Sequence, residues 1–444
     1  MPSPVLSRRL LLRSALGAGA VVGLGPLLAA CGDGGSTTAL PAGETADLTG
    51  ATIRAMVNQP HVLAFTELLA PAFEREFGGR LETTAVPYDQ LTSQQILDVQ
   101  GGAGQFDVFD YFYFGLGALV DAGALVDLTD QLAAVDTSDF LRSVYDAYTL
   151  LDGRRYGVPF DGDVHVLYYN REVFETYGLE PPRTWDEYDA AARTITERSG
   201  GSVYGAVVEG QQVPMILGCS FINRLAGYGG SLLGPDGAPA LTSDAAHAAL
   251  QHLVDVAPYA LPTPLQIGFD QANSAFLSGQ AAMLDTWTDL GLKAQDPASS
   301  QIVDKWGVVP LPVGGSNTEH RTALNAGFGL GVSTAAADPA QAAAFVLWAT
   351  DRTRNLLLAS TAGAGIDPAR RSTLESPEYA AATAPATEVI RQALTGSPLV
   401  WPKDADAPRL LQDLVDQLAL AISGAQTPQQ SLANAQASWE RALT

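Results

Sequence analysis

Strand patterns that alternate with helix patterns constrain the fold of the first part of this chain more than any other feature. Apolar residues alternate over Thr52–Val57, which predicts a strand, and recur at helical spacing over Val62–Phe77. A second strand is predicted over Leu81–Pro87, a helix over Leu91–Gln100 and a third strand over Phe106–Phe114. Because such alternation produces a parallel wound sheet, ligands are expected outside the carboxyl ends of these strands.

Polar and aromatic residues follow two of these strands directly. Loops at the carboxyl ends of parallel strands carry binding residues, so these side chains are candidates for ligand contact. They are Asn58, Gln59 and His61 after the first strand, and Asp110, Tyr111 and Tyr113 at the end of the third.

A chain of 444 residues is too long for one compact core and indicates two domains. The stretch Tyr156–Asn170 (YGVPFDGDVHVLYYN) is predicted to cross between them. It follows the turn signal Asp152–Gly153, and its apolar alternation at Val164, Val166 and Tyr168 predicts a strand. Local chemistry alone fits an ordinary interior strand equally well.

The composition excludes several classes of function. With 48 acidic against 25 basic residues the formal charge is −23, which disfavours nucleic acid and other anionic partners. Such acidity is typical of a solvated surface and names no substrate. Two cysteines permit at most one disulfide, and five scattered histidines form no zinc-type cluster. We therefore expect neither a metal site nor a cofactor.

The first fifty residues predict export and lipid anchoring. Residues 1–30 carry arginines before the apolar stretch Ser14–Ala30, and Leu28-Ala29-Ala30-Cys31 matches the lipobox of a lipoprotein signal peptide. Ser7–Leu12 also resembles a twin-arginine signal. Residues 31–50 have the composition of a flexible tether. We expect lipidation of Cys31 and an extracytoplasmic protein anchored to the outer face of the cell membrane.

Helices are predicted in the second half of the chain as well. Thr184 and Glu187 have the spacing of a capping box, which predicts a helix from there to about Ser199. Further helix patterns cover Pro214–Ala226, Ser243–Val256 and Phe269–Met283.

Several motifs, in order along the chain, resemble one known family. They are Asp152-Gly153 with Tyr156-Gly157-Val158-Pro159, Tyr168-Tyr169-Asn170-Arg171, Pro182–Glu187, Phe276–Met283 leading to Trp287, Gly307–Pro312, and Pro368–Ser372. Together with the lipobox, they resemble the sugar-type extracellular solute-binding proteins of ABC importers, the group that contains maltose-binding protein. The resemblance covers residues 50 to 444.

The resemblance implies an α/β fold of the periplasmic-binding-protein type, with two lobes, a hinge of crossing strands and a ligand cleft between the lobes. The first lobe is expected to comprise residues 51–161 and 313–362, and the second residues 162–312 and 363–444. The crossings are then expected near Gly162–His165, Leu311–Gly314 and Thr361–Ile366.

The resemblance also implies a function. The protein is expected to be a monomeric binding protein, without enzymatic activity, that captures a sugar or oligosaccharide and delivers it to the permease subunits of an ABC transporter in the membrane.

Site residues follow from the same resemblance. Trp287 is expected to stack on a sugar face, although a buried core tryptophan fits the same position. Arg370 is expected to hold paired hydroxyls. Asp161 is expected to contact the ligand, although an aspartate that accepts hydrogen bonds from backbone amides in a turn fits the same position. Trp401 is expected either to cap the cleft or to be a surface tryptophan. The remaining candidates are Phe160, Phe221, Asn325, Gly327 and Phe328, the last in place of the family's tryptophan.

Two alternatives remain open at this level. A secreted carbohydrate-active hydrolase needs only two suitably placed carboxylates, and acids are plentiful, but no G-x-S-x-G, P-loop or H-E-x-x-H motif is present. A non-sugar solute such as a peptide, a polyamine or iron is the other alternative. Adjacent strand residues point to opposite faces, so Tyr168 and Tyr169 make a poor pair of iron ligands.

Overall fold

The computed structural model describes residues 46–396 and 398–443. The predicted signal peptide (1–30), the lipidation site Cys31 and most of the predicted tether (31–50) lie outside the described residues. Within the described ranges, no helix is long and apolar enough to cross a membrane.

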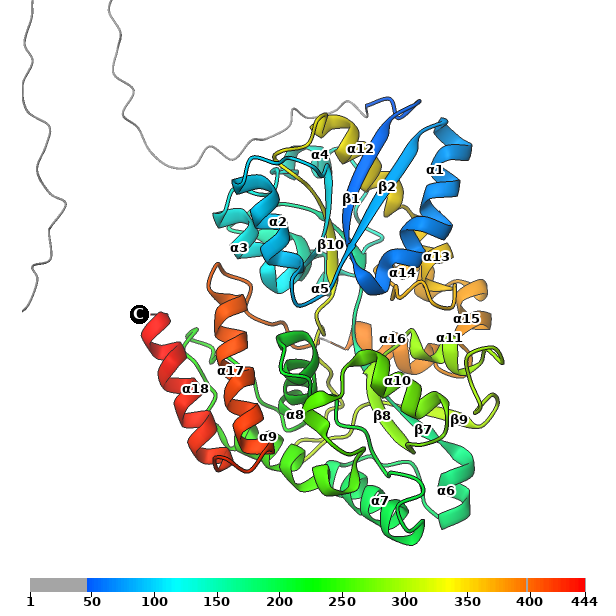
Figure 1. Ribbon diagram of the computed structural model, residues 1–444, viewed down its shortest axis with the longest axis vertical. Coiled ribbons are helices and arrows are strands. Elements are labelled where there is room, and N and C mark those ends of the chain that lie inside the picture. The colour runs from blue at the N-terminus through cyan, green and yellow to red at the C-terminus, as the bar shows by residue number, and fades with distance from the viewer. Residues whose placement is uncertain (1–45, 397, 444) are drawn as a thin grey trace, which may run out of the picture. The chain divides into compact units, whose positions relative to one another are not determined.

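A five-stranded sheet carries the first part of the chain (Figure 1). Its strand order is β2-β1-β3-β10-β6; β1 is parallel to β2 and β3, and β10 is antiparallel to β3 and β6. This confirms the predicted parallel arrangement. The strands are β1 (Thr52–Asn58), β2 (Arg80–Val86), β3 (Val108–Phe112), β6 (Val158–Asp161) and β10 (Phe328–Val332).

Helices cover both faces of this sheet, and its inner strands β1, β3 and β10 are mainly buried, whereas the edge strand β2 is largely exposed or half-buried. In β1, Ala55 and Val57 belong to one buried apolar cluster and Met56 to another, as strand alternation requires. The predicted helix over Val62–Phe77 forms as a π-helical segment, Ala64–Leu69, followed by α1. The helices are α1 (Ala70–Phe77), α2 (Leu91–Gln100), α3 (Leu116–Asp121), α4 (Thr129–Ala133), α5 (Arg142–Thr149), α12 (Pro339–Ala349) and α13 (Arg352–Ala359).

The predicted turn at Asp152–Gly153 joins a short hairpin, β4 (Leu150–Leu151) and β5 (Arg154–Arg155). Both turn residues have positive φ, 49° and 77°, which is the conformation that two-residue hairpin loops require. The turn signal in the sequence is therefore confirmed.

A three-stranded sheet carries the later part of the chain. Its central strand β7 (His165–Asn170) pairs antiparallel with β8 (Met283–Trp287) and β9 (Trp306–Val309). The surrounding helices are α6 (Arg171–Tyr177), α7 (Trp185–Arg198), α8 (Cys219–Gly227), α9 (Asp244–Val256), α10 (Phe269–Leu277), α11 (Leu290–Ala294), α14 (Arg371–Leu374), α15 (Pro377–Thr383), α16 (Thr387–Thr395), α17 (Ala407–Ile422) and α18 (Pro428–Ala442).

The capping box at the start of α7 is present, since Thr184 accepts from the backbone of Glu187 and Glu187 accepts from the backbone of Thr184. The predicted helix over Phe269–Met283 is too long. It ends at Leu277, because Gly279 adopts φ 76°, and Met283 already begins β8. The apolar motif at these positions therefore belongs to a helix, a turn and a strand.

Three segments connect the two sheets. The first is the short link between β6 and β7. The observed return lies later than the predicted Leu311–Gly314, because Val313 still pairs with Thr184 at the start of α7, whereas Leu324 pairs with Val164 and leads into β10. The third segment passes through Asp367, whose backbone N–H donates to Asp161.

We predict that Gly327→Ala destabilises the protein by about 1–3 kcal/mol, the usual cost of overpacking a core. A Cβ at Gly327 would lie 1.9 Å from the hydroxyl oxygen of Tyr148, whose ring stacks on Tyr113. Gly218→Ala is the matched control, since its Cβ would lie 3.6 Å from the nearest atom. Chemical denaturation measures both variants, and a wild-type free energy of unfolding for Gly327→Ala would refute the steric argument.

Candidate ligand-binding site

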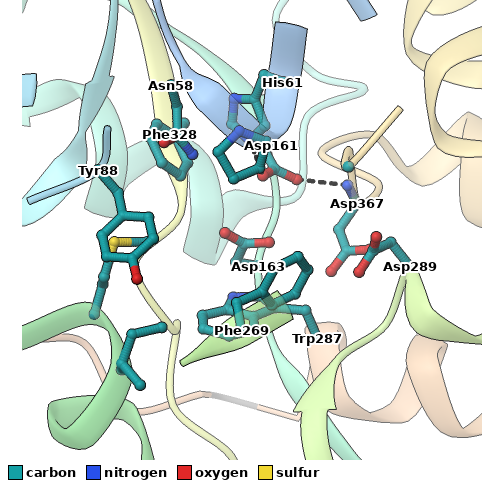
Figure 2. Close-up of a pocket in the computed structure, with 14 residues that line it drawn as sticks. Asn58, His61, Tyr88, Asp161, Asp163, Phe269, Trp287, Asp289, Phe328 and Asp367 are labelled. Atoms are coloured by element: carbon teal, nitrogen blue, oxygen red, sulfur yellow. Dashed lines mark hydrogen bonds and ion pairs between the residues drawn. The ribbon is translucent and has the colours of Figure 1, made fainter. Parts of the chain in front are cut away.

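A cavity of about 40 Å³ lies where the two sheets face each other (Figure 2). Its lining comes from the carboxyl end of β1, the end of β6, the start of β10, the end of β8 and the segments that connect the sheets. The lining residues are Asn58, Pro60, His61, Tyr88, Asp161, Asp163, Met215, Ile216, Phe269, Trp287, Asp289, Phe328, Gly365 and Asp367.

His61 links two strands of the five-stranded sheet at this cavity. Its Nδ1 lies 2.8 Å from Asp110 Oδ2 and its Nε2 lies 3.1 Å from Asp161 Oδ2. Asp110 Oδ2 also accepts from the backbone N–H of Asn58 at 3.0 Å. Burial by itself lowers the pKa of His61, but the charges and hydrogen bonds of Asp110 and Asp161 raise it to about 10. The ring is therefore an imidazolium at neutral pH.

Four buried aspartates form one wall of the cavity, and we call Asp161, Asp163, Asp289 and Asp367 the carboxylate wall. Carboxylate oxygens of Asp161, Asp163 and Asp367 lie within 4.8 Å of one another. The backbone N–H of Thr288 donates to Asp367 Oδ2 at 3.3 Å. Figure 2 shows the Asp163 carboxylate turned toward Asp161. Oxygen donors of this kind suit hard cations, and they are not the nitrogen and sulfur set typical of zinc.

The pKa is raised for three of these carboxyl groups, those of Asp161, Asp163 and Asp367. Burial raises the pKa of Asp163 and of Asp367 well above the ordinary value, and the charge of Asp161 adds to both effects. Burial also raises the pKa of Asp161, although its hydrogen bond to His61 acts in the opposite direction. Asp289 is compensated by Lys293, whose Nζ lies 3.0 Å from its Oδ2.

Aromatic side chains line the same cavity. Trp287 is only 6% exposed, and its Nε1 donates to the backbone oxygen of Asn325 at 3.0 Å. Its ring meets Phe269 edge-on at a centroid distance of 5.4 Å. Phe328 packs edge-on against His61 at 4.4 Å. The site therefore combines a flat aromatic surface with a row of acceptors.

The structure brings together five of the residues proposed from the sequence: Asn58, His61, Asp161, Trp287 and Phe328. Asp110 lies behind them and supports His61. The other nine proposed residues do not line this cavity: Gln59, Tyr111, Tyr113, Phe160, Phe221, Asn325, Gly327, Arg370 and Trp401.

Most of these nine are occupied elsewhere. Arg370 donates to Thr350 O at 2.8 Å, pairs with Asp139 and covers the ring of Phe140 at 3.8 Å. Tyr113 is buried and donates to Leu324 O, and Trp401 stacks on Phe114.

Four further members are buried, whereas Gln59 is exposed. Tyr111 donates to Tyr148 O at 2.8 Å, and the amide nitrogen of Asn325 donates to Asn223. Phe160 and Phe221 are core side chains that are 1% and 0% exposed. These residues build the scaffold behind the cavity.

Nine lining residues were missed in the sequence. Asp163 lies two positions after Asp161, and Asp289 lies two positions after Trp287. Because Asp161 and Trp287 were proposed as ligand contacts, this spacing could have pointed to both aspartates. The others have no local pattern that points to a ligand: Pro60, Tyr88, Met215, Ile216, Phe269, Gly365 and Asp367.

The architecture is that of the two-lobed periplasmic binding proteins, in which a solute lies between two α/β lobes. An ABC transporter solute-binding protein of Agrobacterium radiobacter K84, solved with ribitol, superposes with a TM-score of 0.80 at 26% identity over 89% of this chain and 100% of that chain. A maltose-bound protein of T. maritima has the same fold, with a TM-score of 0.79 at 22% identity over 88% and 100% of the two chains.

This chain belongs to the family of bacterial extracellular solute-binding proteins, which it matches over residues 58–353. It is 25% identical to a probable amino-acid ABC transporter periplasmic-binding protein of Sinorhizobium fredii, over 87% of this chain and 88% of that protein. It is also 25% identical to the mannitol-binding protein of Pseudomonas aeruginosa, over 68% and 70%.

We predict that Asp163→Asn stabilises the ligand-free protein near pH 8 by about 0.5–2 kcal/mol, as substitutions at destabilised functional sites commonly do. A carboxyl whose pKa is raised on folding destabilises the folded state increasingly as pH rises above its unfolded pKa of 3.8. The amide is uncharged, so the gain should shrink as pH falls to about 4.

Melting curves of wild type and variant across this pH range measure the difference. Asp161, Asp289 and Asp367 face Asp163, and their charges raise its pKa, so the variant also relieves the repulsion between these carboxylates and Asp163. A variant that melts below wild type near pH 8 would show that the Asp163 carboxylate is favourable in the empty site.

Proposed function

We propose that this protein is the extracytoplasmic substrate-binding component of an ABC importer and that it captures a small carbohydrate or sugar alcohol in the cavity between its lobes. The observation that carries the proposal is that the Trp287 ring and the carboxylate wall line one cavity. Sugars present apolar C–H faces that stack on flat rings and hydroxyls that donate to carboxylates.

Relatives support this class of ligand. The Agrobacterium radiobacter protein at 26% identity was solved with ribitol, and the Pseudomonas aeruginosa relative is a mannitol-binding protein. An arabinooligosaccharide-binding protein of Halalkalibacterium halodurans is 29% identical over 32% of each chain. The Sinorhizobium fredii relative is named for amino acids, so a solute that bears an amine belongs in the same panel of test compounds.

The protein is proposed to bind its ligand without converting it. A glycosidase needs two carboxyl groups on opposite sides of the bond that it breaks. Here Asp161, Asp163 and Asp367 are clustered, with carboxylate oxygens within 4.8 Å of one another, rather than placed on two sides of a bond. That arrangement favours recognition over hydrolysis.

Iron held by the adjacent tyrosines is disfavoured by their environments. The Tyr168 hydroxyl donates to Thr288 O at 2.9 Å, whereas the ring of Tyr169 packs against Phe174. The two side chains lie on opposite faces of β7, as expected for neighbours in a strand.

A melting-temperature screen over monosaccharides, disaccharides and sugar alcohols tests the proposal. A ligand that binds only the folded state raises the melting temperature. At a ligand concentration a hundred times Kd, it stabilises the folded state by about 2.7 kcal/mol. Chromatography of the same samples should show no new product. Product formation, or no shift from any member of the panel, would contradict the function.

We predict that Trp287→Ala weakens binding of the best panel member by ten- to about a hundredfold, or roughly 1–3 kcal/mol, as truncation of a buried aromatic contact does. It also removes the hydrogen bond to Asn325 O, so some loss of stability is expected. Trp287→Phe keeps a flat ring and serves as the control. Calorimetric titration and a melting curve of the same sample separate the loss of affinity from the loss of stability. An unchanged affinity with a lower melting temperature would show that Trp287 is a packing residue only.

We further propose that Cys31 carries a lipid anchor and that the protein functions as a monomer beside its permease. The lipobox before Cys31 supports the anchor. Cys31→Ser should move the protein from the membrane fraction to the soluble fraction or leave it unprocessed. A processed, membrane-bound variant would refute the anchor.

A further inference from the structure

The side chains that line the cavity offer many acceptors, but their strong donors are already used. Both ring nitrogens of His61 are bound to carboxylates, at 2.8 and 3.1 Å. The Trp287 N–H donates to Asn325 O, and the Tyr88 hydroxyl donates to Gln211 Oε1. The side-chain amide of Asn58 is the remaining polar group: its nitrogen can donate to a ligand, and its oxygen has no hydrogen-bond partner although Asn58 is only 1% exposed.

A neutral sugar does not match this lining well. Each hydroxyl both donates and accepts, so a sugar site normally supplies donors as well as acceptors. A ligand held here has to donate into Asp163, Asp367 and the Asn58 oxygen and finds few side-chain donors in return. An ammonium group has three donors and no acceptor, so it suits such a surface.

The charges around the cavity lead to the same conclusion. Five buried aspartates, Asp110 and the four of the carboxylate wall, face two cations, His61 and Lys293, and each of these cations is already paired. Arg224, a buried arginine of α8, is bound to Asp285 in β8. Burial raises the pKa of Asp163 and Asp367, so ionising these carboxyl groups in the empty site is costly, and a cationic ligand would offset that cost by pairing with the ionised carboxylates.

The aromatic side chains suit the same kind of group. Trp287 and Phe269 line the same cavity as the carboxylate wall, and cations are attracted to the faces of such rings. In this structure Lys293 Nζ already lies 5.0 Å from the centroid of the Phe269 ring while it pairs with Asp289. The site thus contains one internal example of an ammonium held between a carboxylate and an aromatic ring.

We propose that the ligand is a small polyhydroxylated cation, an amino sugar or amino alcohol, whose ammonium group binds Asp163 and Asp367 while its carbon face lies on Trp287. This inference rests on the proposed function and narrows it to one chemical class. Asp161 is placed behind these two residues and holds them in position, because its oxygens accept from His61 and from the backbone N–H of Asp367.

A bare divalent cation explains the site less well. Calcium takes six to eight oxygen ligands, and the Asp161 oxygens are already engaged by N–H donors. A metal would also leave the aromatic side chains without a role.

Calorimetric titration with matched pairs tests the proposal. D-Glucosamine is compared with D-glucose and with N-acetyl-D-glucosamine, whose amide is neutral, and 1-amino-1-deoxy-D-sorbitol is compared with D-sorbitol. At neutral pH and physiological salt, at least one ammonium compound should bind tenfold or more tighter than its neutral partners. Calcium chloride alone is titrated as a further probe.

Asp163→Asn should reduce this preference to less than threefold, because one carboxylate that contacts the ammonium becomes an amide. Asp270→Asn is the matched control: it removes the same charge from an exposed position in α10, beside the lining residue Phe269, and should leave the preference unchanged. Asp289→Asn provides a second variant if Asp163→Asn does not fold, and it should weaken the preference in the same direction.

The outcomes test the cationic ligand and the carbohydrate-binding function separately. Neutral sugars that bind as tightly as their amines would overturn the cationic ligand and leave the proposed function intact. An ammonium preference that survives in Asp163→Asn would also overturn it. Binding of calcium alone, with no response to either series, would contradict both the cationic ligand and the carbohydrate function.

Discussion

The contacts of His61 with Asp110 and Asp161 are the interaction on which the site depends. His61 follows β1, Asp110 lies in β3 and Asp161 ends β6, so one imidazolium joins three strands of the same sheet at their cavity end. All three side chains are at most 2% exposed. Removing one partner would leave a buried charge without compensation, a loss that is typically strongly destabilising. The ring therefore fixes the position from which the chain leaves for the second lobe.

Beyond Asp161 the backbone is constrained by close packing. Gly162 donates its N–H to Asp367 O at 3.2 Å, and a Cβ at this position would lie 2.2 Å from the carbonyl oxygen of Pro368. Two connecting segments that are 200 residues apart in sequence thus touch at a glycine. This contact brings Asp163 and Asp367 to the same cavity. The close packing of the two connecting segments is therefore also the reason why the carboxylates are clustered.

The fold could be predicted from the sequence because its signals are local. Strand alternation in β1, the left-handed turn at Asp152–Gly153 and the capping box at Thr184 each depend on a few neighbouring residues. The site was predicted only in part. Trp287 and Asp161 follow recognisable motifs, whereas Asp367 reaches the cavity through a backbone contact with Asp161 that no local pattern encodes. Arg370 shows the converse: its motif resembles a binding arginine, but Asp139, Phe140 and Thr350 hold it elsewhere.

The central claim is that the ligand is enclosed between two lobes that move. The cavity of about 40 Å³ is far smaller than the roughly 300 Å³ at the lower end of ligand pockets, so separation of the lobes would make room for a ligand. Small-angle X-ray scattering tests this most directly. The radius of gyration should fall when the ligand-free protein is saturated with the panel compound that gives the largest melting shift, because binding draws an open population to the closed form. An unchanged radius, with binding verified in the same sample, would contradict enclosure by lobe closure.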